Sequence, residues 1–137
     1  MQVTFDCADP GALAAFWSQA LPGYALQPPP EGFSSWEDWL VERQVSTEHW
    51  NDISAAVGDG PRLLFLKVPE PKSVKNRVHL DLQSGGGPEV PQEEQQRRVR
   101  AEVARLQALG ATLVEERSEM GTTWAVMTDP EGNEFCA

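Results

Sequence analysis

A short run of alternating apolar and polar residues occurs twice in the chain and constrains its fold more than any other feature. Residues 3–7 read VTFDC and residues 78–82 read VHLDL, so Asp6 and Asp81 hold the same place in the two runs. Alternation with a period of two is typical of a half-buried strand, whose polar side chains all leave from one face. Because the runs lie slightly more than half the chain length apart, we expect one structural unit used twice.

The first run is followed by signals for a helix and then for further strands. Asp9 and Pro10 are typical of a helix start, and apolar residues three and four positions apart follow them as far as residue 21. A Pro–Gly pair then ends the predicted helix. Further strands are expected at residues 24–27 and 62–68. In the later strand, Leu64, Leu66 and Val68 share a face.

Residues 33–50 hold three of the five tryptophans and are expected to form a short amphipathic helix and a second turn. Trp36 and Trp39 are three positions apart, so on a helix they lie on the same side. The segment is interpreted as a lid over a pocket, as a dimer contact, or as a cap on one end of the core. As a lid, its acidic rim would favour a ligand with a cationic end. The rim consists of Glu37, Asp38 and Glu42.

The second run is preceded by a Pro- and Lys-containing connector at residues 70–75 and followed by the same order of elements. A charged helix is predicted over residues 92–109, because its apolar residues fall on one helical face and Gly110 follows as a C-cap. The apolar stripe consists of Val99, Val103, Leu106 and Leu109. Strands are expected at residues 111–116, 123–128 and 133–137.

The composition excludes several classes of partner. With 137 residues, the chain is long enough for one domain whose core needs no disulfide. Its net charge of −10 repels phosphate backbones and anionic lipids, so we expect neither nucleic acid nor a membrane as partner. No apolar run is long enough to span a bilayer. Because no secretory signal is visible, we expect Cys7 and Cys136 to be free thiols in the reducing cytoplasm.

Three motifs occur in order along the chain. Residues 8–10 (ADP) lead into residues 13–17 (LAAFW), residues 68–72 (VPEPK) lead into residues 76–81 (NRVHLD), and residues 129–136 read DPEGNEFC. Together they resemble the vicinal oxygen chelate superfamily, and within it the glyoxalase-like and bleomycin-resistance-like proteins. The resemblance covers essentially the whole chain.

The resemblance implies an α+β fold of two tandem βαβββ modules whose curved sheets enclose a cleft. Residues 1–137 would then form a single domain, with module one at residues 1–69, the connector at residues 70–75 and module two at residues 76–137. Because many functions occur on this fold, the fold does not settle the activity.

Metal-dependent members of the superfamily place one ligand on the first and one on the last strand of each module. The corresponding residues of this chain are Gln2, Leu66, His79 and Cys136. Leu66 cannot bind a metal, and Cys136 stands where a glutamate is expected, with Glu134 two positions earlier on the same face. A shift of two residues on the first strand would place Thr4 instead of Gln2. We therefore predict no metal, and keep Gln2, His79 and Glu134 as candidates for the alternative.

Strand parity alone places a cluster of polar side chains in the predicted cleft. Asp6, His79, Asp81 and Glu134 would face it, and such clusters are enriched at functional sites because neighbouring charges perturb each other's pKa values. His79 beside an aspartate is a candidate general base. Alternatively, the aspartates have a structural role and accept hydrogen bonds from backbone groups or from arginines. Cys136 is expected to be inert.

Two classes of function remain after these arguments. The preferred one is binding of a small aromatic or amphipathic molecule without a metal or another cofactor, with Asp6, His79, Asp81, Glu134, Trp36 and Trp39 as ligand-binding residues. The alternative is a metal-dependent lyase, isomerase or dioxygenase that uses His79. Whether the chain is an enzyme stays open. The resemblance also implies a homodimer.

Overall fold

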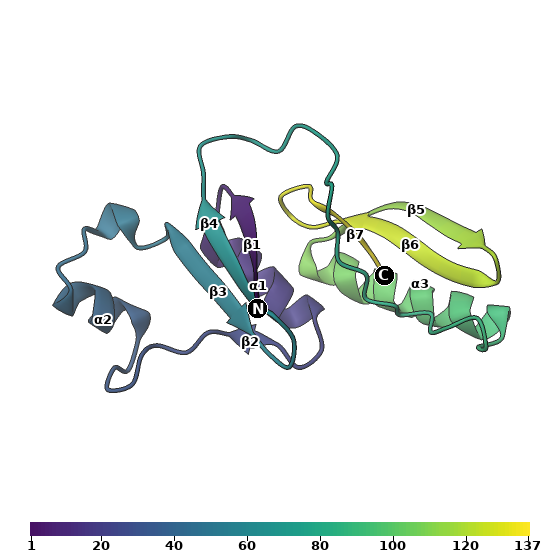
Figure 1. The fold of residues 1–137 in the computed structure, drawn as a ribbon, viewed down its shortest axis with the longest axis horizontal. Coiled ribbons are helices and arrows are strands. Elements are labelled where there is room, and N and C mark those ends of the chain that lie inside the picture. Colours follow the sequence, from purple (N-terminus) through teal and green to yellow (C-terminus); the bar gives the residue numbers. More distant parts are fainter. The chain divides into compact units, whose positions relative to one another are not determined.

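The computed structural model describes residues 1–137 and divides into two units, Met1–Pro71 and Lys72–Ala137, each built around one sheet (Figure 1). The first unit contains, in order, β1 (Gln2–Cys7), α1 (Pro10–Ala20), β2 (Ala25–Leu26), α2 (Trp36–Glu42), the short 3-10 helix η1 (Thr47–His49), β3 (Ile53–Val57) and β4 (Arg62–Lys67). The second contains α3 (Gln92–Leu109), β5 (Thr112–Glu119), β6 (Thr122–Thr128) and β7 (Glu134–Cys136). This is the predicted α+β class, and the boundary falls inside the predicted connector.

The sheet of the first unit has the strand order β1-β4-β3-β2, with β1 and β4 parallel and the other pairs antiparallel. The βαβββ order is therefore present in this unit. The sequence pattern did not predict β3, whose residues do not alternate cleanly. In β4 the buried residues are Leu63 and Phe65, which face α1. Leu64 and Leu66 share the opposite, half-buried face.

Helix α1 begins and ends as its sequence predicts. The Asp9 side chain accepts a hydrogen bond from the Ala12 backbone N–H, which is the role of an N-cap residue. The side-chain amide of Asn51 also donates to Asp9, and this contact is the main reason that the pKa of Asp9 lies below its usual value. Trp17 is fully buried, and its ring lies 5.8 Å from that of Phe5.

The tryptophan-rich segment forms α2 as expected, but no residue of this helix is buried. The rings of Trp36 and Trp39 meet edge to face at 5.7 Å, and the guanidinium of Arg43 lies 5.3 Å from the Trp39 ring. The Trp36 indole N–H donates to the backbone oxygen of Gln27, at the end of β2. The interpretation of these tryptophans as a cap on the core is therefore wrong, because the core lies between α1 and the sheet.

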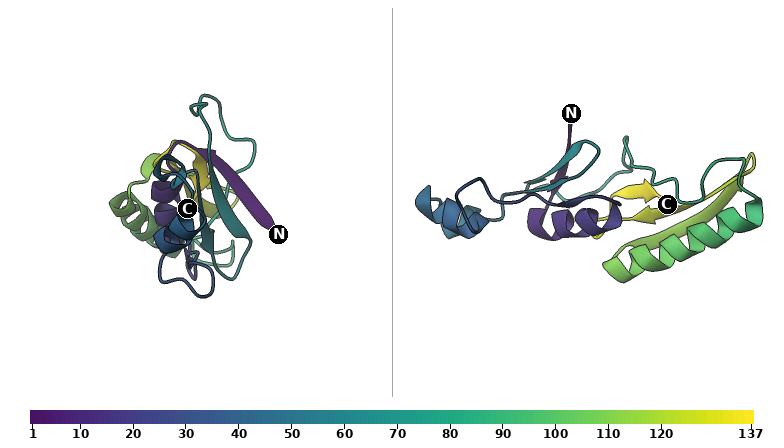
Figure 2. Two further views of the ribbon diagram at one scale, coloured as in Figure 1. Left: turned by 90° about the vertical axis from the view of Figure 1, so that its left-hand side faces the viewer. Right: turned by 90° about the horizontal axis from the view of Figure 1, so that it is seen from below.

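The second unit packs α3 against β5 and β6, as Figure 2 shows. The helix spans the predicted residues and ends at Gly110, which has the left-handed conformation (φ 112°) expected of a C-cap. Val99, Val103 and Leu106 are buried against the sheet, whose order is β5-β6-β7. Strand β5 extends three residues beyond its predicted end, to Glu119.

The predicted strand at residues 78–82 is wrong in extent. Only Asp81 pairs with the sheet, in an isolated parallel bridge to Cys136. Val78, predicted to cover the core, is 75% exposed. The predicted strand is this short because its neighbouring strand, β7, has only three residues and offers hydrogen bonds for a single bridge. The equivalent pair of the first unit, Asp6 and Leu66, lies in a full parallel ladder.

The turn before β7 fixes the end of the chain. Asp129 is buried, and one of its oxygens accepts hydrogen bonds from the backbone N–H groups of Glu131 and Asn133. Gly132 takes the positive φ (85°) that the turn requires. The predicted turn is thus confirmed, and it directs Glu134 and Cys136 onto β7.

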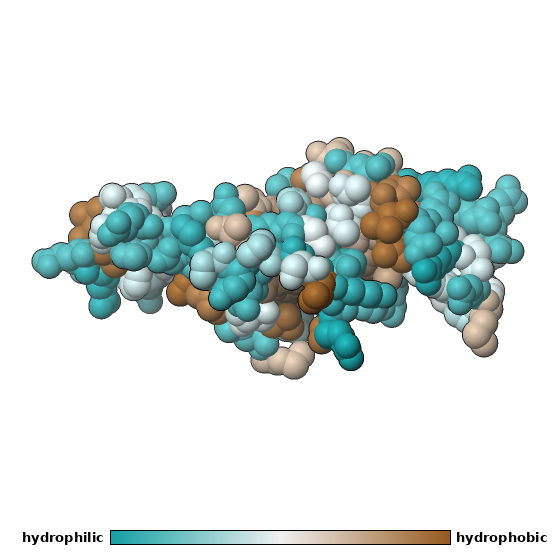
Figure 3. All heavy atoms as spheres, turned by 90° about the horizontal axis from the view of Figure 1, so that it is seen from above, coloured by the Kyte–Doolittle hydropathy of each residue, from teal (hydrophilic) through white to brown (hydrophobic).

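Hydrophilic residues cover most of the face drawn in Figure 3, with apolar residues reaching the surface in places. The large apolar residues that are more than half exposed, apart from Met1 and Met120, are Val41, Ile53, Val74, Val78 and Val114. None of the helices has the length and apolar character needed to cross a membrane.

Candidate ligand site in the second unit

A hollow of about 680 Å³ lies on the second unit. Trp124 and Val126 line it from β6, where they alternate with buried residues that face α3, so they belong to the open face of the sheet. The glycine-rich loop of residues 85–87 also lines the hollow. Gly85 must be a glycine, since a Cβ atom there would lie 2.7 Å from the backbone oxygen of Thr123.

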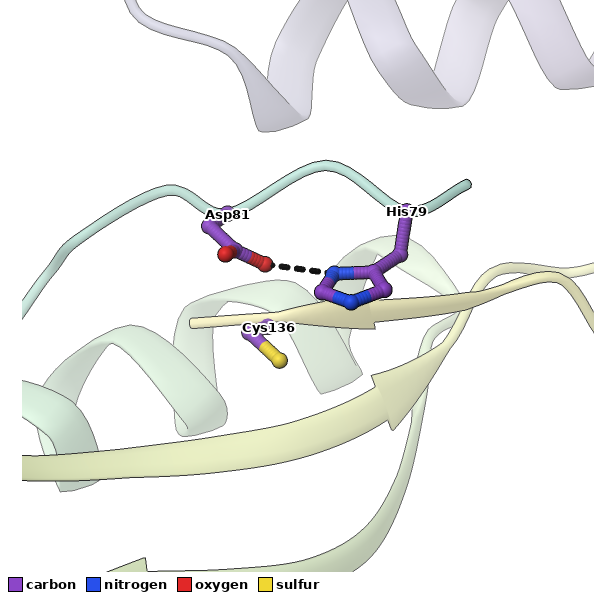
Figure 4. Close-up of side chains that lie close together, drawn as sticks. All are labelled: His79, Asp81 and Cys136. Atoms are coloured by element: carbon purple, nitrogen blue, oxygen red, sulfur yellow. Dashed lines mark hydrogen bonds and ion pairs between the residues drawn. The ribbon is translucent and has the colours of Figure 1, made fainter. Parts of the chain in front are cut away.

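Three polar side chains meet in this hollow: His79, Asp81 and Cys136 (Figure 4). His79 and Asp81 leave the same side of their segment, as the alternation predicts, and Nδ1 of His79 lies 2.7 Å from Oδ1 of Asp81. The bridge to β7 brings the Cys136 thiol beside them. Two backbone hydrogen bonds of 2.9 Å hold this bridge: Leu82 N–H donates to Cys136 O, and Cys136 N–H donates to Leu80 O.

The hydrogen bond to Asp81 determines what His79 can do. A carboxylate only accepts hydrogen bonds, so the imidazole Nδ1–H must be the donor. In the neutral imidazole, the other ring nitrogen, Nε2, is then an acceptor that is available to a bound molecule. About half of each side chain is exposed, 47% for His79 and 50% for Asp81, so the pair is accessible from solvent.

Cys136 is not poised as a nucleophile. Partial burial raises the pKa of its thiol to about 11, with a further contribution from the negative charge of Asp81. The thiol is therefore protonated at neutral pH, whereas reactive cysteines are thiolates. This agrees with the expectation that Cys136 is inert.

Glu134 lines the hollow and also makes contacts that hold the unit together. Its Oε2 accepts hydrogen bonds from the Lys72 ammonium at 3.1 Å and from the Asn76 backbone N–H at 3.0 Å. The Asn76 contact is the main reason that the pKa of Glu134 is lowered to about 2. These contacts fasten the beginning of the second unit to β7.

The remaining predicted ligand-binding residues lie in the first unit. Asp6 is exposed on β1, on the same face of the sheet as Leu66, and its side chain takes no hydrogen bond or ion pair. Trp36 and Trp39 form their own cluster on α2. For these residues, ligand binding stays a prediction.

Several residues that line the hollow were not identified from the sequence. The main ones are Lys75, Glu115, Arg117, Trp124 and Val126. The alternation in β6 could have indicated Trp124 and Val126. Glu115 and Arg117 could not have been identified, because a bulge between Leu113 and Glu115 shifts the register of β5 against β6.

Comparison with known proteins agrees with this architecture. The family model described as a glyoxalase-like domain matches residues 2–137. The chain belongs to the glyoxalase-like domain family. No curated protein sequence matches it.

Solved structures of glyoxalase-like proteins share the fold. A glyoxalase/bleomycin resistance protein/dioxygenase family enzyme from Burkholderia phytofirmans PsJN is 18% identical, with a TM-score of 0.61 over 98% of this chain and 93% of that one. The fosfomycin resistance protein FosX from Listeria monocytogenes, as a mutant complexed with Mn(II) and 1S,2S-dihydroxypropylphosphonic acid, is 13% identical, with a TM-score of 0.59 over 98% and 84%. Lactoylglutathione lyase from Agrobacterium tumefaciens is 13% identical, with a TM-score of 0.52 over 99% and 89%.

The residues of this glyoxalase-like chain do not fit the four-ligand metal site that the superfamily implies. Leu66 has no donor atom, and Oε1 of Gln2 accepts a hydrogen bond of 2.5 Å from Arg62. One oxygen of Glu134, Oε2, already accepts hydrogen bonds from Lys72 and Asn76. What remains is one group of three possible donors, His79, Asp81 and Cys136, whose ligand atoms lie within 4.8 Å of one another.

Proposed function

We propose that this glyoxalase-like protein binds a small aromatic or amphipathic molecule in the hollow of the second unit, without the metal of its metal-dependent relatives. The observation that supports the proposal best is the hollow itself. Its volume of about 680 Å³ lies within the range of small-molecule sites. Apolar side chains with a few convergent polar groups are also the usual composition of such sites. The predicted cleft between the two sheets stays a prediction.

Two further properties belong to the proposal. We expect a homodimer, as the resemblance implies. We also expect a cytoplasmic protein, because both cysteines are free and free thiols persist in reducing compartments.

A screen of small aromatic molecules tests the proposal, with binding mapped by amide chemical shifts in the presence of a chelator. Shifts should cluster at residues 79–87 and 122–126. Trp124→Ala should weaken binding about five- to thirtyfold, as truncation of a central aromatic contact does. Trp50→Ala, in the first unit, is the matched control and should leave affinity unchanged. Chemical-shift changes elsewhere, or equal ligand affinity for the two variants, would count against the hollow as the binding site.

A second candidate function is metal-dependent lyase, isomerase or dioxygenase chemistry at His79. The observation that favours it is the group of possible donors formed by His79, Asp81 and Cys136. Elemental analysis of protein purified without chelator separates the two functions. A metal at one equivalent per chain, lost in His79→Ala and retained in His49→Ala, would replace the first proposal with the second.

A further inference from the structure

Each of the three carboxylates that line the hollow has a hydrogen-bond partner, and for Glu134 and Glu115 that partner is a cation, which changes the expectation of a cationic ligand. Besides the Asp81–His79 and Glu134–Lys72 contacts, an oxygen of Glu115 accepts a hydrogen bond of 2.5 Å from Arg117. Together with Lys72, which pairs with Glu134, the cations Lys75 and Arg117 match the three carboxylates Asp81, Glu115 and Glu134, so the hollow carries no excess negative charge that would favour a cationic ligand. The ammonium of Lys75 lines the hollow without an ion pair, so a cationic ligand would meet repulsion there.

Among the side chains that line the hollow, His79 offers a hydrogen-bond acceptor that no protein group occupies. Since Nδ1–H of His79 donates to Asp81, Nε2 of the neutral imidazole presents a lone pair to any molecule in the hollow. Trp124 and Val126 provide the apolar surface on the open face of β6. The site therefore combines an apolar surface for a ring with one acceptor for a hydroxyl or N–H donor.

Resting on the function proposed above, we propose that the ligand is an uncharged aromatic molecule bearing a hydroxyl group, which donates its hydrogen bond to Nε2 of His79. Asp81 is the positioning residue. It holds the imidazole in the tautomer that accepts at Nε2, and it is itself held in place by the backbone bridge to Cys136. Without Asp81 the ring could carry its proton on Nε2, and the acceptor would be lost.

Two matched probes test the ligand class: 2-naphthol, which has a hydroxyl donor, and 2-methoxynaphthalene, which has the same ring system without one. The native protein should bind 2-naphthol about three- to tenfold more tightly, the range expected for one net hydrogen bond. In His79→Phe this preference should disappear while both probes still bind.

The role of Asp81 has its own readout. In Asp81→Asn the preference for 2-naphthol should fall, and ¹⁵N NMR of the imidazole should show His79 leaving the Nδ1–H tautomer. The chain offers a close control, because Nδ1 of His49 also lies 2.7 Å from a carboxylate, that of Asp52. Asp52→Asn should change the His49 signals and leave both the His79 signals and probe binding as in the native protein.

The outcomes separate this inference from the function on which it rests. If neither probe binds the hollow of the native protein, the proposed function itself fails for aromatic ligands. If both bind there with equal affinity, the hollow is a binding site but the hydroxyl class is wrong. An unchanged His79 tautomer in Asp81→Asn would overturn the positioning role.

Discussion

Two side chains of the second unit show how single residues hold its loops in place. The amide of Gln95 is fully buried and donates to the backbone oxygens of Val90 and Gly121, both at 2.8 Å. Its oxygen accepts from the Thr123 N–H, also at 2.8 Å. Gln95 thereby ties the loop before α3 and the β5–β6 turn to one helix. Glu134 likewise ties the connector to β7 through its contacts with Lys72 and Asn76.

At this scale we predict that Gln95→Leu lowers the free energy of unfolding by about 2–4 kcal/mol, because it leaves buried backbone groups without partners. Urea unfolding followed by circular dichroism measures the loss. Gln107→Leu, an exposed position on the same helix, should change stability by less than about 0.5 kcal/mol. Similar midpoints for the two variants would show that the buried amide contributes nothing.

Among the elements, α2 differs from α1 and α3 because none of its residues is buried. Its Ser35 side chain caps the helix by accepting from the Asp38 N–H, and Glu37 and Asp38 in the first turn favour the helix dipole. The helix is therefore stabilised largely by local contacts. Its two tryptophans support each other and not the core of the unit.

We predict that Trp39→Ala lowers the free energy of unfolding by only about 1–2 kcal/mol, the sum of an edge-to-face contact and a cation–π contact. Trp17→Ala is the matched comparison: the same truncation in the core should cost about 3–5 kcal/mol. Denaturant unfolding gives both values. Equal losses would mean that α2 is part of the core after all.

For the whole molecule, net charge and exposed apolar surface have opposite effects on the association of two copies of the chain. A net charge of −10 makes copies of the chain repel each other at low salt. Val41 and Ile53 leave apolar surface exposed on the first unit, at 62% and 57% of their area. Burial of such surface between copies would favour association, as the expected homodimer requires.

We predict that sedimentation velocity at micromolar concentration shows a species of twice the 15.1 kDa chain mass. The dimer fraction should rise between about 0.01 M and about 1 M salt, because the Debye length falls from about 30 Å to about 3 Å. Val41→Asp, which adds charge to the exposed surface of α2, should reduce the dimer fraction. A single monomeric species at both salt concentrations would exclude the homodimer.

Much of this protein follows from local sequence, because caps, turns and periodicity act over a few residues. Asp9 and Gly110 define helix ends, and the alternation in residues 3–7 identifies β1 and its faces. The same rule correctly placed His79 and Asp81 on one side of their segment. The motifs at residues 68–81 and 129–136 indicated the family, which the match over residues 2–137 then established.

Tertiary structure alone decided which polar groups remain available, since that depends on partners far away in the chain. Oε2 of Glu134, a predicted ligand-binding residue, accepts hydrogen bonds from Lys72 and Asn76, about sixty residues earlier. The strand expected at residues 78–82 shrank to one bridge because its only neighbour, β7, is three residues long. Local pattern gives the direction of a side chain, but long-range pairing decides whether that side chain is free to bind.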